Sequence, residues 1–187
     1  PREVIATTGP SGAVKSTILK LIGGLYHAQA GAVLIDGIDI RQLDCAELRN
    51  VIAYLPQACH FFHGTIAQNL RLAEPTAGDD ALTEAARDAG VLDDILAFPQ
   101  GFDTRLDHKL RPHLPSGFLQ RLMLARTYVR YSCIYLFDEP IKTLDAAGEA
   151  AFLRKLGELR SRASVVIVTH RRNHIELADR VLYMESG

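Results

Sequence analysis

The sequence predicts an α/β fold in which a mostly parallel, wound sheet carries an inserted all-helical subdomain. Short β-branched or apolar runs alternate with helix-periodic segments toward both ends of the chain. Two runs, 134–137 and 165–168, are apolar at every position, which is typical of strands buried on both faces of a parallel sheet. From about Thr65 to Tyr131 no strand pattern is evident and helical patterns dominate, which indicates the insertion.

Length, composition and net charge indicate which kind of protein this is. The 187 residues suit one soluble domain with an insertion, at 48% apolar and 23% charged residues. A net charge of −1 gives no basic field, so we expect no nucleic-acid partner. The 3 cysteines form no C-x-x-C pair and indicate reduced thiols in the cytosol. Both ends fall beside expected strands, so we expect a piece of a longer chain, truncated at both ends.

The core elements follow in order, with turn residues between them. The expected elements before the insertion are a strand at 4–7, a helix from 18 to 22 that Gly23 and Gly24 end, strands at 32–37 and 38–43, a helix at 46–50 and a strand at 51–55. After the insertion we expect a strand at 134–139, a helix capped by Asp145, and strands at 165–169 and 181–184. The predicted core therefore comprises 1–70 and 132–187.

The insertion, 71–131, is expected to hold helices at 81–89, 91–97 and 116–131. In the last of these helices, Phe118, Leu122, Ala125 and Val129 share one face. Arg121 and Arg130 fall off that apolar stripe, so we expect them to remain solvated.

The loop between the first strand and the first helix is the main functional signal. Residues 9–17 read GPSGAVKST and approach the phosphate-binding pattern G-x-x-x-x-G-K-[ST]. Backbone N–H groups and a helix N-terminus would face the anion, Lys15 would reach the terminal phosphates, and the Ser16 hydroxyl would hold Mg²⁺. The predicted nucleotide contacts are Gly9, Ser11, Gly12, Ala13, Val14, Lys15, Ser16 and Thr17. An ordinary strand–turn–helix with a solvated lysine is the alternative, so the rest of the chain must decide.

One position departs from the pattern, because Val14 stands where its second glycine belongs. A β-branched residue resists the positive φ that glycine supplies, and the strain is of order 1–3 kcal/mol. If binding demands that angle, nucleotide affinity falls by roughly ten- to a hundredfold. We therefore expect a loop that is displaced from the nucleotide-bound shape without nucleotide, or that is empty in a crystal.

Polar residues at the ends of three expected strands form the second signal. Asp138 and Glu139 follow a buried strand, where an acid can hold Mg²⁺ and its neighbour can act as general base toward water. The alternative is a pair of acids favoured by a helix dipole. Gln57 and His170 also follow strands, at the edge where wound sheets place ligand residues.

The order of these segments resembles the nucleotide-binding domain of ABC transporters, over essentially the whole chain. The matching segments are Gly9–Thr17, Gln57, the helical insertion, Asp138-Glu139-Pro140, Leu144-Asp145 and His170. Segments 61–70, 99–104 and 177–181 resemble the exporters of the family. The resemblance implies a P-loop NTPase-type fold, catalytic roles for Glu139, His170 and Gln57, and metal ligands at Ser16, Gln57 and Asp138.

Two family segments are altered here. The signature L-S-G-G-Q is replaced by Leu114-Pro115-Ser116-Gly117-Phe118, in a register fixed by Gln120 and Arg121. The resemblance implies that Ser116 and Gly117 contact the nucleotide of an opposing subunit. From its position alone, we hypothesise that Ser116 supplies the hydroxyl that Pro115 lacks. The family's S-A-L-D segment is Lys142-Thr143-Leu144-Asp145.

The implied function is an ATPase that couples MgATP-driven pairing of two such domains, head to tail, to substrate export. Its expected partners are a transmembrane domain in the same or a separate chain and a second nucleotide-binding domain, at the cytoplasmic face of the cell (inner) membrane. Val14 and the altered signature suggest reduced activity. Two alternatives stay open: a hydrolysis-impaired or regulatory half of an asymmetric pair, and a soluble ABC ATPase that acts on DNA or ribosomes.

Overall fold

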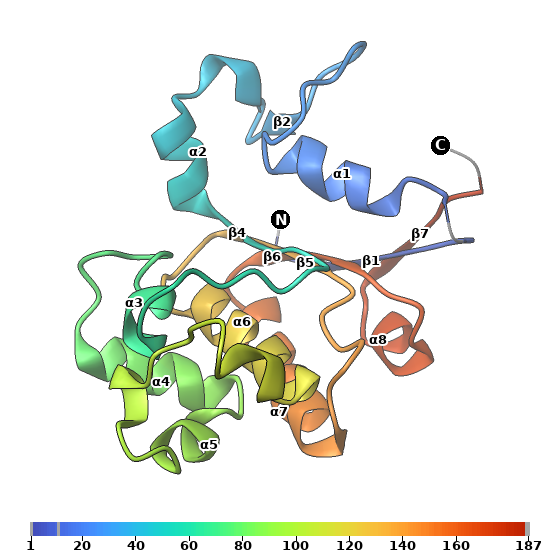
Figure 1. Ribbon diagram of the computed structural model, residues 1–187. Coiled ribbons are helices and arrows are strands. Elements are labelled where there is room, and N and C mark those ends of the chain that lie inside the picture. Colours follow the sequence, from blue (N-terminus) through green and yellow to red (C-terminus); the bar gives the residue numbers. More distant parts are fainter. Residues whose placement is uncertain (1, 11, 186–187) are drawn as a thin grey trace. The chain divides into compact units, whose positions relative to one another are not determined.

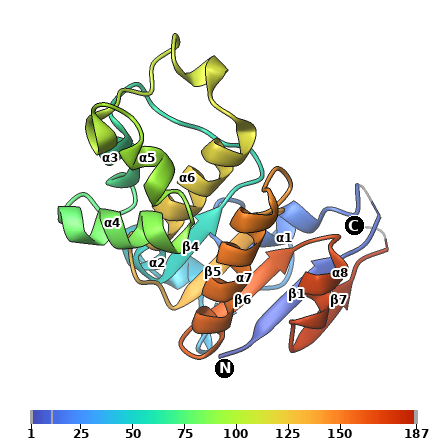
Figure 2. The ribbon, with the colours of Figure 1, turned by 90° about the horizontal axis from the view of Figure 1, so that it is seen from below.

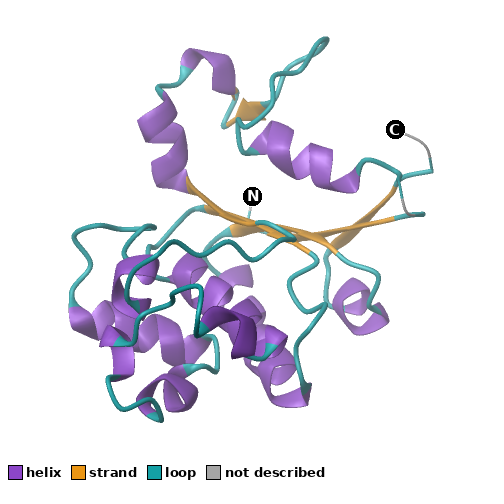
Figure 3. Cartoon of the chain, in the orientation of Figure 1, coloured by secondary structure: helices purple, strands orange, loops and turns teal. Residues whose placement is uncertain are grey.

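The computed structural model describes residues 2–10 and 12–185, and the chain divides into two compact units. The first unit comprises 1–56, 132–140 and 159–187, and the second comprises 57–131 and 141–158. Strands gather in the first unit and helices dominate the second (Figure 3). No helix among the described residues is both long enough and apolar enough to cross a bilayer.

A five-stranded parallel sheet forms the centre of the first unit and confirms the predicted fold class. Its strands lie in the order β4-β5-β6-β1-β7 (Figure 2). Each neighbouring pair is parallel, and Asp138 at the end of β5 is level with Val168 at the end of β6. The bounds are β1 Val4–Thr8, β4 Ile52–Leu55, β5 Ile134–Asp138, β6 Ser164–Val168 and β7 Arg180–Tyr183.

The expected strands at 32–37 and 38–43 are much shorter than predicted. They form a hairpin of β2, Leu34–Ile35, and β3, Ile38–Asp39. Asp36 and Gly37 both have positive φ, the geometry that an Asp-Gly hairpin turn requires. A 3₁₀ turn at Ile40–Gln42 then leads to α2, Cys45–Val51, where Asp44 caps the helix by accepting the N–H of Ala46 at 2.7 Å.

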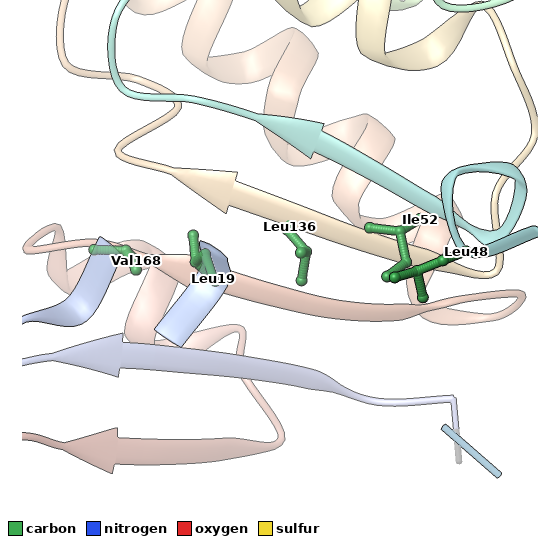
Figure 4. Packing of buried hydrophobic residues seen from close by; sticks show 5 residues of the cluster. All are labelled: Leu19, Leu48, Ile52, Leu136 and Val168. Atoms are coloured by element: carbon green, nitrogen blue, oxygen red, sulfur yellow. The ribbon is translucent and has the colours of Figure 1, made fainter. Parts of the chain in front are cut away.

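Helices cover both faces of the sheet within the first unit. α1, Lys15–Ile22, and α2 lie on one side, and α8, Arg172–Glu176, lies on the other (Figure 1). One core cluster joins α1 and α2 to the sheet (Figure 4), and burial of its apolar side chains stabilises the arrangement of the strand ends. Its members are Leu19, Leu48, Ile52, Leu136 and Val168.

The second unit is helical, as the insertion was predicted to be. Its elements are α3 Ile66–Leu70, α4 Asp79–Asp88, α5 Leu92–Leu96, two 3₁₀ turns at Gly101–Asp103 and Arg111–His113, α6 Ser116–Tyr128, and most of α7, Ala146–Arg160. Phe118 and Leu122 of α6 are buried as predicted. Asp145 precedes α7 and accepts the N–H of Gly148 at 2.8 Å, which confirms its capping role.

The prediction that Arg121, on α6, and Arg130, just after it, remain solvated is wrong. Arg121 donates to the carbonyl of Gly90 at 2.6 Å and pairs with Asp94 at 2.9 Å, so its side chain is only 14% exposed. Arg130 is partly buried as well. An off-stripe position on α6 still meets protein here, because the α4–α5 region packs beside it.

The two units differ from the expected domain limits at 57–70 and 141–158. α3 packs against α6, which places 57–70 with the helices. α7 packs on α4 and α6 through Lys155, a buried cation that pairs with Asp88 and lies 5.6 Å from the ring centre of Tyr128. These contacts assign α7 to the helical unit although its sequence pattern resembled that of the core.

Candidate functional site

The loop between β1 and α1 is shaped by two glycines, Gly9 and Gly12, at backbone angles that other residues rarely adopt. Gly9 has φ 144°, and a Cβ atom there would lie 2.0 Å from the carbonyl oxygen of Met184, just after β7. Gly12 has φ 87°, in the region that favours glycine. The loop therefore brings its backbone close to the sheet edge. Ser11, a predicted contact, lies outside the described residues.

Val14 adopts the left-handed conformation that its branched side chain disfavours, with φ 54° and ψ 22° at the cap position of α1. Val14 thus has the positive φ that the glycine of the pattern would supply, although its side chain resists that angle. The strain therefore belongs to the loop in the shape it has in this structure, and binding in that shape would not have to create it. Whether the remainder of the loop departs from a nucleotide-binding shape stays a prediction.

Lys15 holds its ammonium group inside this loop. Its Nζ donates to the carbonyl oxygens of Gly9 at 2.9 Å and Pro10 at 2.7 Å, and the residue is 7% exposed. No carboxylate within the described part of the chain pairs with it. Four loop amides donate to no acceptor among residues 2–10 and 12–185: Gly12, Val14, Lys15 and Ser16. A buried cation and free N–H groups make the loop receptive to an anion.

Ser16 joins the loop to the end of β5. Its hydroxyl donates to Oδ1 of Asp138 at 3.0 Å, and Asp138 is 2% exposed. Burial raises the pKa of Asp138, the hydrogen bond from Ser16 lowers it, and the negative charge of Glu139 raises it further. Burial, aided by the negative charge of Asp138, also raises the pKa of Tyr54 to about 12. A cation beside Asp138 would relieve this unfavourable burial of charge.

Glu139 and His170 lie at the ends of the adjacent strands β5 and β6. The N–H of Glu139 donates to the carbonyl of Val168 at 3.0 Å, and its φ of 49° turns the chain sharply before Pro140. Oε1 of Glu139 lies 3.9 Å from Nε2 of His170, and both side chains are partly exposed. The structure thus brings Lys15, Ser16, Asp138, Glu139 and His170 to one edge of the sheet.

Sequence reasoning missed Thr169, which holds the turn that carries His170. Its buried Oγ1 accepts the N–H of Arg171 at 3.0 Å and lies 3.5 Å from Nδ1 of His174. A threonine directly after an apolar strand and before a histidine was the only available signal, and it is weak without coordinates.

The second unit carries the remaining predicted residues. Gln57 is its first residue and is exposed. Ser116 is the first residue of α6, preceded by Pro115, and Thr143 lies against this end of the helix. The Thr143 hydroxyl lies 3.4 Å from the carbonyl of Ser116, and a Cβ on Gly117 would come within 3.1 Å of the Thr143 carbonyl. A larger residue at Gly117 would therefore push the two segments apart.

The first unit's site suits a metal that arrives with other ligands. No group of three or more His, Cys, Asp or Glu among the described residues could hold a metal ion. Mg²⁺ needs no such cage, since it binds through one or two carboxylates together with phosphate oxygens and water. The Ser16–Asp138 pair beside the Lys15 loop offers oxygen ligands of that kind.

The chain is similar in sequence to known proteins over its whole length. The family model described as "ABC transporter" matches residues 1–142. Human "ATP-binding cassette sub-family B member 6" is 38% identical over 187 residues, covering 100% of this chain and 22% of that protein. "Mycobactin import ATP-binding/permease protein IrtB" of Mycobacterium bovis is 40% identical over 188 residues, covering 100% of this chain and 32% of that protein. The chain thus spans a fifth to a third of the length of these relatives.

A solved structure is similar as well. It is described as "Structure of a bacterial Atm1-family ABC exporter with ATP bound", and it is 33% identical with a TM-score of 0.92. The match covers 98% of this chain and 32% of that one.

Proposed function

The chain belongs to the ABC transporter family and is an ATP-binding domain of that family, and from this premise we propose that it hydrolyses MgATP to drive export. Its partners would be a transmembrane domain and a second ATP-binding domain, at the cytoplasmic face of the cell membrane. The hydrogen bond between Ser16 and the buried Asp138 beside the Lys15 loop is the observation that carries the proposal.

Lys15 and the loop amides would bind the triphosphate. Among the described residues, the Lys15 ammonium donates to two carbonyl oxygens and pairs with no carboxylate, so a phosphate oxygen would offer it a stronger, charge-assisted partner. The N–H groups at the start of α1, which have no acceptor within residues 2–10 and 12–185, would orient the same anion. Together they would neutralise charge that develops on the phosphate during transfer.

Ser16 and Asp138 would hold the magnesium ion, with Gln57 as a further ligand. Bound Mg²⁺ supplies charge neutralisation on the phosphate oxygens. The Ser16 hydroxyl, which now donates to Asp138, would turn its lone pair toward the cation. Asp138 would remain ionised there, because a nearby cation offsets the burial that raises its pKa.

Glu139 would accept a proton from the attacking water as general base, and His170 would orient that water and the terminal phosphate. The 3.9 Å between Glu139 Oε1 and His170 Nε2 allows both side chains to contact one small molecule. The strained backbone of Glu139, at φ 49°, supports an active-site role, since strain of this kind clusters at functional sites.

Ser116 and Gly117 would contact the nucleotide held by the second subunit. They occupy the first turn of α6, whose helix dipole favours an anion. Pro115 has no N–H and no hydroxyl, so Ser116 would be the only side-chain hydroxyl in the five-residue signature segment 114–118.

ATP turnover tests this proposal. Glu139→Gln should lower turnover by about a hundredfold or more while MgATP binding persists, because it removes the base and keeps the shape. Glu84→Gln, at an exposed position on α4, is the matched control and should leave turnover unchanged. Parent turnover equal to that of Glu139→Gln would refute hydrolysis by this chain.

Two observations favour narrower variants of the function. Pro115 in the signature favours a hydrolysis-impaired half of an asymmetric pair, which the same turnover assay separates from an active ATPase. One relative's name describes import of mycobactin, which favours transport in the opposite direction. Uptake against release of a labelled substrate in membrane vesicles distinguishes import from export.

A further inference from the structure

The loop at residues 59–62, just after Gln57, is hydrogen-bonded at each of its residues to other segments of the second unit. Four successive carbonyl oxygens accept hydrogen bonds from side chains. Arg111 donates to Cys59 at 3.4 Å and to Phe61 at 3.5 Å, and Arg126 donates to His60 at 3.1 Å. Asn69 donates to Phe62 at 3.0 Å and accepts its N–H at 2.9 Å. Surface loops usually leave such groups to water.

Among the side chains that donate to this loop, Arg126 of α6 is the one whose charge is most costly to bury. Burial lowers its pKa, and no carboxylate in the described chain pairs with it. Its guanidinium instead lies 5.7 Å from the ring centre of Phe61 and contacts Met123 Sδ at 2.9 Å. A partly buried guanidinium with carbonyl, sulfur and ring partners is tolerated only where its planar fork is well placed.

α6 connects this loop to the residues proposed to meet the second subunit's nucleotide. Ser116 and Gly117 form its first turn, Gln120 accepts the Cys59 thiol at 3.2 Å, and Arg126 lies near its far end. From Ser116 to Arg126 the helix rises about 15 Å as a single rigid element.

We propose that Arg126, assisted by Arg111, is a positioning residue that makes the 59–62 loop and the first turn of α6 one rigid body. Engagement of a nucleotide at Ser116 would then move the loop that follows Gln57, and displacement of that loop would withdraw Ser116. This inference rests on the proposed function, because the nucleotide contact at Ser116 belongs to it. It adds a mechanical link that the sequence motifs do not contain.

The rate at which a thiol reagent labels Cys59 reports on this link. Replacing the exposed Cys45 and Cys133 by serine leaves Cys59, which is partly buried, as the single thiol. Arg126→Lys keeps the charge and removes the planar fork. Arg105→Lys, at an exposed arginine on the neighbouring segment, is the matched control.

Three measurements are made on the protein in this background. In the parent, MgATP should slow Cys59 labelling at least about threefold. In Arg126→Lys, labelling should be at least about tenfold faster and insensitive to MgATP. Its affinity for MgATP should stay within about twofold, since Lys15 and Asp138 are intact, while turnover falls about tenfold. Arg105→Lys should match the parent in all three.

Failure of the inference differs from failure of the proposed function. If Arg126→Lys retains MgATP-dependent protection of Cys59 and parental turnover, the link is refuted. If the parent neither binds nor hydrolyses MgATP, the proposed function fails. In that case the hydrogen bonds that hold the 59–62 loop are tested by labelling Cys59 without nucleotide. Equal labelling rates in Arg126→Lys and Arg105→Lys would overturn the inference. Should Arg126→Lys not fold, Arg111→Lys is scored by the same criteria.

Discussion

Val14→Gly separates strain stored in the folded chain from strain created by nucleotide binding. Val14 has φ 54° in this structure, so binding leaves the angle unchanged if the loop receives phosphate in this shape. A cost present in both states cancels from the binding free energy. We therefore expect the MgATP dissociation constant of Val14→Gly to lie within about threefold of the parent's, a smaller change than the sequence alone suggests.

The strain should appear in stability instead. A left-handed backbone angle costs a non-glycine residue roughly 1–2 kcal/mol. Glycine avoids this cost, but it loses more chain entropy on folding, which offsets about 0.5–1 kcal/mol of the gain. The side chain is 43% exposed, so Val14→Ala serves as the control that removes its contacts and keeps the strain. Val14→Gly should exceed Val14→Ala by about 0.5–1 kcal/mol in unfolding free energy.

Denaturant unfolding and nucleotide titration of the three chains measure both quantities. A melting difference of about 1–4 °C between the glycine and alanine variants matches the expected free energy. A tenfold or greater gain in MgATP affinity for Val14→Gly would refute the reasoning, since binding would then demand an angle that the free loop lacks.

Three further predictions concern stability. Gly9→Ala should cost about 3 kcal/mol of unfolding free energy, measured with urea, because its Cβ would lie 2.0 Å from the Met184 carbonyl. Asp88→Asn should cost about 1.5–3 kcal/mol by the same measurement, because it weakens the main partner of the buried Lys155. A hydrogen bond from the backbone N–H of residue 4 lowers the pKa of Asp179. The stabilisation from the Asp179 carboxylate is therefore complete above the pKa that a carboxyl has in the unfolded chain, and it is lost as the pH falls below about 4. In Asp179→Asn, the melting temperature should fall less steeply with pH in this acid range.

The sheet and its functional edge were predictable because their signals are local. An apolar run such as 165–168 indicates a buried strand by itself, and parallel strands bring their carboxyl ends to one edge. The phosphate-binding pattern and the two acids after a buried strand then indicated roles for Lys15, Asp138 and Glu139. Their meeting in the structure follows from that topology.

What the sequence could not predict depends on contacts between distant segments. The left-handed angle at Val14 runs against its own propensity and is imposed by the surrounding loop. Arg121 was expected to remain solvated, and no contact was predicted for Arg126. Both nevertheless donate to backbone carbonyls of segments far away in the sequence. No sequence pattern predicts which distant backbone carbonyl a single arginine side chain will bind. The assignment of α7 to the helical unit likewise depends on Lys155 reaching α4.

Binding of Mn²⁺, as a paramagnetic substitute for Mg²⁺, tests the central claim most directly. The free Mn²⁺ signal in electron paramagnetic resonance is followed while ATP and the chain are titrated together, for the parent and for Asp138→Asn. The geometry at Ser16 and Asp138 predicts a bound Mn²⁺·ATP complex in the parent and an affinity at least tenfold weaker in the variant. Equal affinity in two folded chains would contradict a metal–phosphate site at this edge of the sheet.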